Sequence, residues 1–220
     1  SHDLQEPLRK INSYSGILEK RLKDLDHGDE DIELVLSIIK KSSVRMQKLI
    51  NDLLKYSRVG RKNWEPVRLC LNEVLDTVLD NLEISIQKNS AMIAVGDLPE
   101  ILGDRNHMVM LFQNLISNAV KYQNKGVKPI ISIKASRVNQ KWEFSIKDNG
   151  IGFKKEHADR IFILFNRLHG RGKYEGSGIG LALCKKTVKK LGGEIWAESN
   201  LGEGSTFKFT LPIQKTSEKN

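Results

Sequence analysis

The chain has 220 residues, 39% of them hydrophobic and 29% charged, so its length allows one large or two small domains with packed cores. No apolar run approaches the roughly 20 residues that a membrane-spanning helix requires, and we expect no membrane segment in this piece. The net charge of +9 suits acidic or phosphorylated partners; the basic residues are scattered and lack interleaved aromatics, so no nucleic acid is expected.

The start of the chain and its cysteines bear on where the protein works. It begins with Ser1 and His2 rather than a methionine, so we expect a longer protein whose N-terminal region is missing here. Cys70 and Cys184 lie far apart in the sequence and match no metal-ligand spacing. Reduced thiols are the rule in the cytoplasm, so we predict a cytoplasmic location, with a full-length protein that is soluble or membrane-anchored.

Apolar residues recur in steps of four and three along residues 1–60, which is the spacing of two heptad helices. The seam residues are Leu4, Leu8, Ile11, Ser15, Leu18, Leu22 and Leu25, followed by Ile32, Val35, Ile39, Ser42, Met46, Leu49, Leu53 and Tyr56. The break at 25–29 predicts an antiparallel hairpin. Further apolar residues beside the seam, such as Leu36 and Ile50, widen its apolar face. We therefore expect two hairpins to associate into a four-helix bundle, as a homodimer.

The first turn of this hairpin carries a histidine that is soon followed by a proline. His2 lies one step off the seam, so its imidazole is expected to face outward, beside Asp3. Pro7 removes one helix hydrogen bond and frees the carbonyl of Asp3, which bends or loosens the helix. A surface histidine near a frayed terminus is the simpler interpretation. Because proline in a helix interior costs roughly 3 kcal/mol, its position favours a histidine that is presented to a partner.

The heptad pattern ends near residue 60, and the remainder predicts a second domain. Residues 61–66 are typical of a hinge, 67–214 of a folded domain and 215–220 of a tail. The expected strands are 67–71, 91–95, 129–137, 141–147, 194–199 and 206–212, and the expected helices run from the cap Asn72 to Gln87, from the cap Asp104 to Tyr122 and from Gly180 to Leu191. These elements predict an α+β chain in which the second domain has a mixed sheet with three helices on one face.

One face of the helix that ends near Tyr122 is polar. Asn114, Asn118 and Lys121 are four and three residues apart, so they share that face. An amide oxygen is a neutral ligand that suits a partly hydrated Mg²⁺, and a lysine supplies positive charge for phosphate. A polar stripe that merely faces solvent is the alternative interpretation.

Two glycine-rich segments follow in the second domain. Asp148-Asn149-Gly150-Ile151-Gly152-Phe153 comes after a strand pattern, and a carboxylate beside close-approach backbone suits an adenine-type ring with its amine donor. An Asn-Gly turn between two strands is the alternative for that segment. Gly176-Ser177-Gly178-Ile179-Gly180-Leu181 opens a helix, where unhindered backbone amides can bind phosphate. It is neither a dinucleotide fingerprint nor a P-loop.

Taken together, these segments resemble the sensor histidine kinases of two-component signalling, over nearly the whole chain. The matching segments are His2–Leu8 for the H box, Asn114–Tyr122 for the N box, Asp148–Phe153 for the G1 box, Ile161–Phe165 for the F box and Gly176–Leu181 for the G2 box. Residues His2–Arg9 are similar to kinases that follow phytochrome-like sensors. The resemblance implies a dimerising histidine-phosphotransfer hairpin over 1–60 and a Bergerat-type (GHKL) ATP-binding α/β sandwich over 67–214.

The resemblance also implies a role for each matched residue. His2 would accept the γ-phosphoryl group of ATP, with Asp3 orienting the ring and taking its proton and Arg167 steadying the transferring group. Asp148 would accept a hydrogen bond from the adenine amine, and Asn118 would hold Mg²⁺. The residues implied to contact the nucleotide are Asn114, Asn118, Lys121, Tyr122, Asp148, Gly150, Gly152, Gly176, Gly178, Gly180 and Leu181.

The same resemblance implies partners. The phosphohistidine would pass its phosphoryl group to an aspartate in the receiver domain of a response regulator, and a sensor region would precede this piece. Glu6 stands where many relatives carry Thr or Asn, so the resemblance does not extend to phosphatase activity. Two other functions fit the sequence less well: a nucleotide-driven clamp like the ATPase domains of topoisomerases and chaperones, and a basic nucleic-acid-binding dimer. The exposed His2 favours the kinase, because a clamp needs no histidine there.

Overall fold

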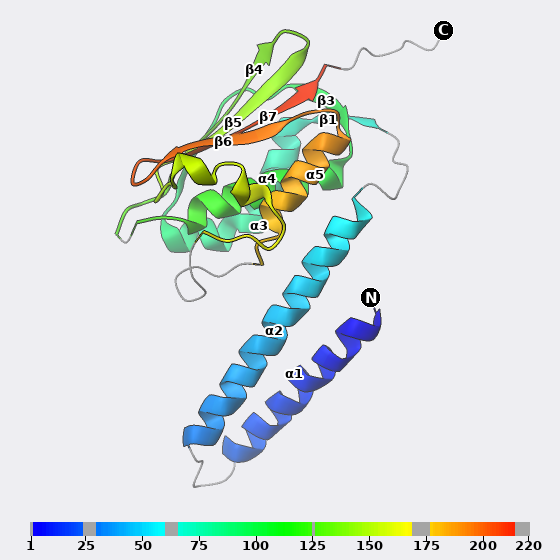
Figure 1. The fold of residues 1–220 in the computed structure, drawn as a ribbon, viewed down its shortest axis with the longest axis vertical. Coiled ribbons are helices and arrows are strands. Elements are labelled where there is room, and N and C mark those ends of the chain that lie inside the picture. Colours follow the sequence, from blue (N-terminus) through cyan, green and yellow to red (C-terminus); the bar gives the residue numbers. More distant parts are fainter. Residues whose placement is uncertain (1, 24–29, 60–65, 125, 169–176, 214–220) are drawn as a thin grey trace. The chain divides into compact units, whose positions relative to one another are not determined.

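A computed structural model of the protein describes residues 2–23, 30–59, 66–124, 126–168 and 177–213. The chain forms two compact units, Ser1–Arg58 and Val59–Asn220 (Figure 1). The predicted hinge at 61–66 and tail at 215–220 lie almost entirely outside the described residues. No helix in the described ranges combines the length and the apolar character that a bilayer crossing requires.

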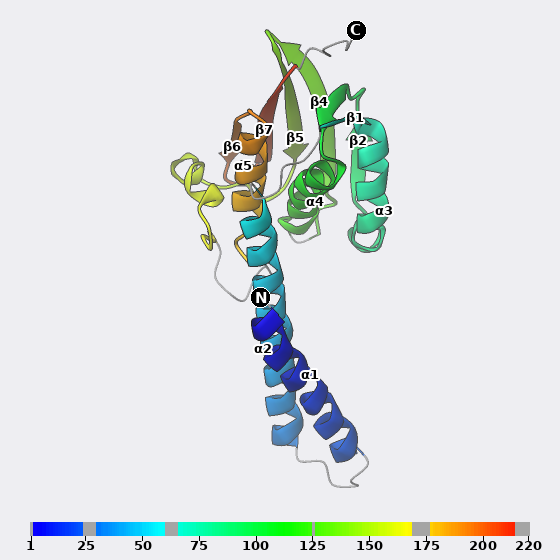
Figure 2. The same cartoon turned by 90° about the vertical axis from the view of Figure 1, so that its right-hand side faces the viewer.

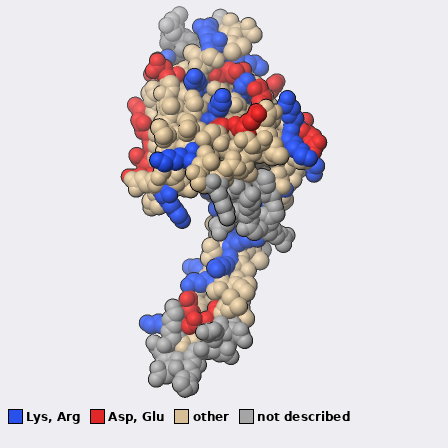
Figure 3. Space-filling model, turned by 90° about the vertical axis from the view of Figure 1, so that its left-hand side faces the viewer, with Lys and Arg blue, Asp and Glu red and all other residues tan. Residues whose placement is uncertain are grey.

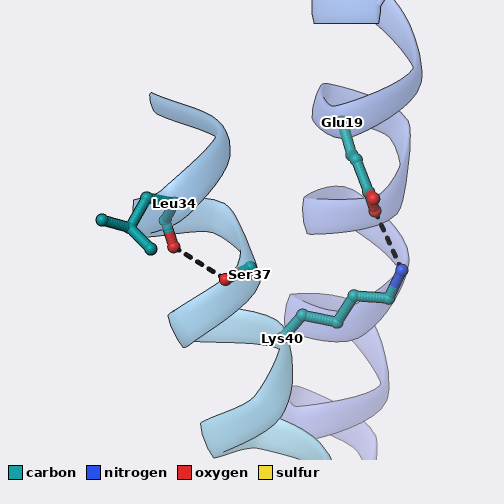
Figure 4. Close-up of polar contacts among 4 residues, drawn as sticks. All are labelled: Glu19, Leu34, Ser37 and Lys40. Carbon is teal, nitrogen blue, oxygen red and sulfur yellow. Dashed lines mark hydrogen bonds and ion pairs between the residues drawn. The ribbon is translucent and has the colours of Figure 1, made fainter. Parts of the chain in front are cut away.

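The first unit is the predicted helical hairpin. It consists of α1 (His2–Lys23) and α2 (Glu30–Arg58), and the break expected at 25–29 falls outside the described residues. An ion pair between the two helices joins Lys40 Nζ to Glu19 Oε2 at 2.9 Å (Figure 4). The helix continues through Pro7, so the missing hydrogen bond at that residue does not end it.

The packing inside the hairpin corrects the predicted seam. The buried residues of the described hairpin are Leu8, Ser15, Leu36 and Ser43, and Leu36 was expected to lie beside the seam rather than in it. Seven predicted seam residues, each 40–53% exposed, form what we call the apolar stripe: Ile11, Leu18, Ile32, Val35, Ile39, Met46 and Leu53. A helix in a four-helix bundle has two neighbours, so its apolar positions divide between them. The sequence pattern could not separate the two sets.

The second unit is built on a five-stranded sheet with the strand order β2-β4-β5-β7-β6. The strands are β2 (Met92–Val95), β4 (Ile130–Val138), β5 (Lys141–Asp148), β6 (Ile195–Asn200) and β7 (Gly204–Pro212). Only β2 and β4 pair in parallel, and the other neighbours are antiparallel. The helices α3 (Leu71–Asn89), α4 (Arg105–Lys121) and α5 (Gly180–Lys190) cover one face of this sheet, as predicted (Figure 2). Two short 3₁₀ helices, Lys155–His157 and Arg160–Phe162, follow β5.

Two predictions about this unit were wrong. The first predicted strand, β1 (Val67–Cys70), pairs not with the main sheet but with β3 (Glu100–Gly103), which the sequence analysis did not anticipate. Four residues after a turn with Pro99 carry too little alternation to indicate a strand. Asn72 does not cap α3 either, because β1 runs directly into the helix and Cys70 takes the cap position. Asp104 does cap α4, with Oδ1 accepting from the His107 backbone at 2.9 Å.

Three phenylalanines form the centre of the α/β core. The rings of Phe144 on β5 and Phe209 on β7 stack at 4.7 Å, and Phe112 on α4 meets both rings edge-on. All three side chains are fully buried. This cluster joins α4 to the middle of the sheet, where β5 and β7 are neighbours.

The aromatic cluster supplies a stability prediction. Phe144→Ala would remove the ring that contacts both others and lower the free energy of unfolding by about 3–5 kcal/mol, because the cavity cannot collapse fully. The matched control is Ile84→Ala at an 83% exposed position, which should change it by only about 0.5 kcal/mol. Urea unfolding measures both, and a loss below about 1 kcal/mol for Phe144→Ala would contradict the packing described.

Candidate functional site

A buried carboxylate lies at the C-terminal end of β5. The side chain of Asp148 is 6% exposed, and its Oδ1 accepts backbone hydrogen bonds from Gly150 at 2.8 Å and from Ser205 at 3.2 Å. Burial raises the pKa of Asp148 to about 6, and the two backbone donors oppose that rise because they favour the charged form. Its Oδ2 accepts no hydrogen bond from the described residues, so this oxygen can accept one from a ligand.

The two glycines after Asp148 are required by the protein's own backbone. A Cβ at Gly150 would collide with the carbonyl of Tyr122, and one at Gly152 would collide with the carbonyl of Asn200. Gly152 also has φ +60, a conformation that side-chain-bearing residues rarely adopt. The backbone of Ile151 donates to the Tyr122 carbonyl at 2.9 Å. The loop after β5 therefore packs between the end of α4 and the β6–β7 turn.

The residues that support this loop from the β6–β7 side belong to none of the motifs recognised in the sequence. Ser199 Oγ accepts from the backbone of Phe153 at 2.9 Å and donates to the carbonyl of Gly204 at 2.7 Å. Gly204 has φ +98, and a Cβ there would collide with the Asp148 carbonyl. Ser205 supplies the second backbone donor to Asp148. The two glycines of the Gly202–Ser205 turn were the available signal, since each marks an unusual backbone position.

Helix α4 brings the predicted polar residues to one face. Asn114 Nδ2 donates to the carbonyl of Met110 at 2.8 Å, and its Oδ1 lies 2.6 Å from where a Cβ on Gly180 would stand. Gly180 therefore allows the start of α5 to approach α4 closely. The half-buried amide of Asn118, one turn further along, makes no hydrogen bond within the described parts of the chain, so it can bind a ligand.

Three residues with positive charge or aromatic character meet where α4 ends. Lys121 Nζ donates to the Tyr122 hydroxyl at 2.8 Å and lies 4.1 Å from the centre of its ring. Burial raises the pKa of Tyr122, and the charge of Arg167 opposes that rise, so the guanidinium acts electrostatically on the phenol. The structure thus brings Arg167, from the segment after the 3₁₀ helices, to the end of the N-box helix.

The start of α5 completes this set of residues. Gly178 has φ +73 and packs against the backbone of Phe165, whose amide donates to the Gly178 carbonyl at 3.0 Å. A Cβ on Gly178 would lie 3.2 Å from Arg167 Cγ. Leu181 is half-buried in the first turn of α5, and Gly176 lies outside the described residues.

These contacts connect nearly all the predicted nucleotide-contacting residues within the second unit. Gly150 donates to Asp148 and lies against the Tyr122 carbonyl, the charge of Arg167 acts on the Tyr122 phenol, and the Arg167 side chain lies beside Gly178. His2 and Asp3 belong to the first unit, where α1 begins at His2, and their side chains lie outside what the structure describes. Among the described residues no three His, Cys, Asp or Glu side chains cluster as metal ligands.

Comparison with known proteins identifies the family. Residues 103–215, about half of the chain, match the histidine kinase-, DNA gyrase B- and HSP90-like ATPase family, and residues 1–62 match the His Kinase A phospho-acceptor domain. The chain belongs to the histidine kinases. The phytochrome-like protein Cph1 of Synechocystis is 40% identical over 213 residues, which are 97% of this chain but only 28% of that protein's length. This histidine kinase chain therefore corresponds to a minor part of such relatives.

Solved structures share its fold. The full-length kinase ShkA in complex with AMPPNP superposes with a TM-score of 0.72 at 24% identity, over 98% of this chain and 45% of that one. The kinase ThkA in complex with the response regulator protein TrrA superposes with a TM-score of 0.67 at 24% identity, over 98% of this chain and 60% of that one. The predicted fold, a helical hairpin followed by an α/β ATP-binding domain, is thereby confirmed.

The buried Asp148 supplies a prediction on pH and stability. Its pKa is raised in the folded state, so the folded state binds the proton more tightly and its contribution to stability is lost as pH rises from about 4 to about 6. Asp148→Asn keeps an acceptor for Gly150 and Ser205 but removes the charge. We expect it to raise the free energy of unfolding at pH 7 by about 1–3 kcal/mol and to leave it unchanged near pH 4.

Urea unfolding of wild type and Asp148→Asn at pH 4, 5, 6 and 7 measures this difference. The other titrating groups are common to both chains, so their contributions cancel. A variant that is less stable than the wild type at pH 7 would contradict the account, because it would mean that the carboxylate stabilises the folded unit.

Proposed function

We propose that the chain is an ATP-dependent protein histidine kinase that phosphorylates its own His2 and passes the phosphoryl group to an aspartate of a response regulator. The observation that carries the proposal is the buried Asp148, linked through Tyr122 and Arg167 to the glycine-rich start of α5. This arrangement occurs in a chain whose first 62 residues match a phospho-acceptor domain. An ATP site and a phosphoacceptor are the two things such a reaction needs.

The adenine end of ATP fits the surroundings of Asp148. Its Oδ2 would accept a hydrogen bond from the exocyclic amine, a contact worth more where bound nucleotide excludes water. The ionised carboxylate is acceptor-only, so it favours an amine donor over the carbonyl that guanine presents at the same ring position. Tyr122 would lie against the nucleotide, as Gly150 and Gly152 hold the loop close to it.

The phosphate end fits the charged residues and the start of α5. Lys121 and Arg167 supply positive charge, and the backbone amides around Gly178, Gly180 and Leu181, together with Gly176, can donate to phosphate oxygens. The amide of Asn118 would hold Mg²⁺, with Asn114 beside it at the approach of α5 to α4. When bound, Mg²⁺ would neutralise phosphate charge and orient the phosphates.

The transfer itself needs little from the protein beyond position and charge. A neutral nitrogen of His2 attacks the γ-phosphorus, the bond from that phosphorus to the β–γ bridging oxygen breaks, and ADP leaves. Asp3 takes the proton that the imidazole loses, and Arg167 stabilises the charge on the transferring group. The carboxylate of the receiver aspartate then attacks the same phosphorus, and the bond to His2 breaks.

The apolar stripe supports the proposed homodimer. Its members are seven residues apart on α1 and three, four or seven apart on α2, so each run lies along one side of its helix. Ile11 and Ile39 each stand three residues after a buried residue, Leu8 and Leu36. Because the helices are antiparallel, these equal offsets place both runs on the same side of the hairpin. A second copy of the hairpin would cover the stripe and complete a four-helix bundle. We assign residues 1–60 to dimerisation and phosphotransfer, 61–66 to a hinge, 67–214 to ATP binding and 215–220 to a tail.

The charge distribution favours this function over nucleic-acid binding. On the face of the α/β unit shown in Figure 3, lysines and arginines are interspersed with aspartates and glutamates. A phosphate backbone is bound by a stripe of one sign, which this face does not present. The phospho-acceptor hairpin likewise favours a kinase over a nucleotide-driven clamp, which has no use for His2.

Incubation with γ-labelled ATP and Mg²⁺ tests the proposal. Wild type should acquire acid-labile, base-stable label, as phosphohistidine does, and His2→Gln should acquire none because the attacking nitrogen is gone. His27→Gln is the matched control and should be labelled like wild type. Label on both histidine variants would move the phosphoacceptor elsewhere, and no label on wild type despite ATP binding would favour the clamp.

A further inference from the structure

A serine on α2 holds the backbone of α1 close to the phosphoacceptor. Ser43 Oγ donates to the carbonyl of Leu8 at 3.0 Å, between residues 35 apart in the sequence. The serine side chain is 4% exposed and the leucine side chain 5% exposed. Leu8 is thus fixed to α2 through its carbonyl, and its side chain is buried. We call this pair the Leu8–Ser43 contact.

The position of this contact along α1 gives it mechanical importance. Pro7 immediately precedes Leu8 and has no amide hydrogen, so the carbonyl of Asp3 receives no helix hydrogen bond and the first turns are held more weakly. His2 lies six residues before Leu8, about 9 Å along the helix axis. The Leu8–Ser43 contact is therefore the first fixed point on the C-terminal side of the weakened turn. The direction of the His2 segment depends on it.

Packing alone does not explain a serine at this place. A buried hydroxyl is unfavourable unless it is hydrogen-bonded, and the heptad pattern calls for an apolar residue in the seam. The Leu8 carbonyl already has its helix partner, so the Ser43 bond is an additional one. One turn after Leu8 on α1, Asn12 has a buried Oδ1 with no hydrogen-bond partner among the described residues. Such departures from local optimum commonly mark functional positions.

We propose that Ser43 is a positioning residue for phosphorylation: its hydrogen bond to the Leu8 carbonyl sets the orientation of the α1 segment that carries His2. The inference rests on the proposed function, since it names what orients the phosphoacceptor of that reaction. Ser43 does not touch the reacting atoms and acts through Leu8. Loss of the bond would let the His2 segment swing about the weakened turn and lower the fraction of productive encounters.

The variants are chosen to separate the hydrogen bond from side-chain bulk. Ser43→Thr keeps the hydroxyl. Ser43→Val has nearly the same shape as the threonine variant but lacks the hydroxyl. Ser37→Ala is the matched control, because Ser37 Oγ also donates to a carbonyl, that of Leu34 at 3.0 Å, but within α2 (Figure 4). It removes a serine-to-carbonyl bond that does not join the two helices.

The test measures the rate of His2 labelling from γ-labelled ATP as a function of ATP concentration. We expect Ser43→Val to lower the maximal rate about tenfold with the KM for ATP unchanged, because the ATP site lies in the other unit. Ser43→Thr and Ser37→Ala should stay within about twofold of wild type. The proposal would be overturned if Ser43→Val and Ser43→Thr lost the same amount of maximal rate, if Ser43→Val lost none, or if Ser43→Val had a raised KM for ATP.

Hydrogen–deuterium exchange of the first two turns of α1 provides a readout without catalysis. Ser43→Val should exchange these amides about tenfold faster than Ser43→Thr while circular dichroism shows the same helix content. If wild type acquires no label, the proposed function fails. The exchange rates then decide alone whether the Ser43 hydrogen bond orients the His2 segment. Equal exchange in the two variants would overturn it even if the chain is an active kinase.

Discussion

The loop that follows β5 is organised around a carboxylate that is kept out of water. Asp148 ends β5, and its Oδ1 gathers the backbone amides of Gly150 and Ser205, which belong to segments more than 50 residues apart. That contact joins the loop after β5 to the start of β7, while the Ile151 amide ties the same loop to the end of α4. The arrangement opposes stability at neutral pH, since burial raises the pKa of the carboxyl group. A group retained at such a cost is expected where function needs it.

The sequence predicted what is encoded locally. Period-two alternation gave the long strands β4, β5 and β7, and the cap at Asp104 fixed the start of α4, so the face bearing Asn114, Asn118 and Lys121 followed from helix geometry. The order of the five motifs then indicated the family without any long-range information. Local signals of this kind depend only on residues a few positions apart.

What the sequence could not supply depends on contacts between distant segments. The need for glycine at 150 and 152 was attributed to an approaching ring, whereas the carbonyls of Tyr122 and Asn200 already forbid a side chain there. Ser199 and Ser205 carry no local pattern, and their roles appear only when β6 and β7 lie beside the Asp148 loop. In the hairpin, period alone could not show that Leu36 and Ser43 face α1 while Ile39 and Met46 remain exposed.

Calorimetric titration of ATP into wild type and Asp148→Asn between pH 5 and 8 tests the central claim most directly. ATP titrates in the same range, so the comparison between the two chains isolates the carboxyl group. If the ionised Asp148 accepts the adenine amine, the affinity of wild type relative to the variant falls about tenfold per pH unit below about pH 6 and is constant above it. A ratio of affinities that does not change with pH would contradict the account, because adenine recognition would then not require the buried charge.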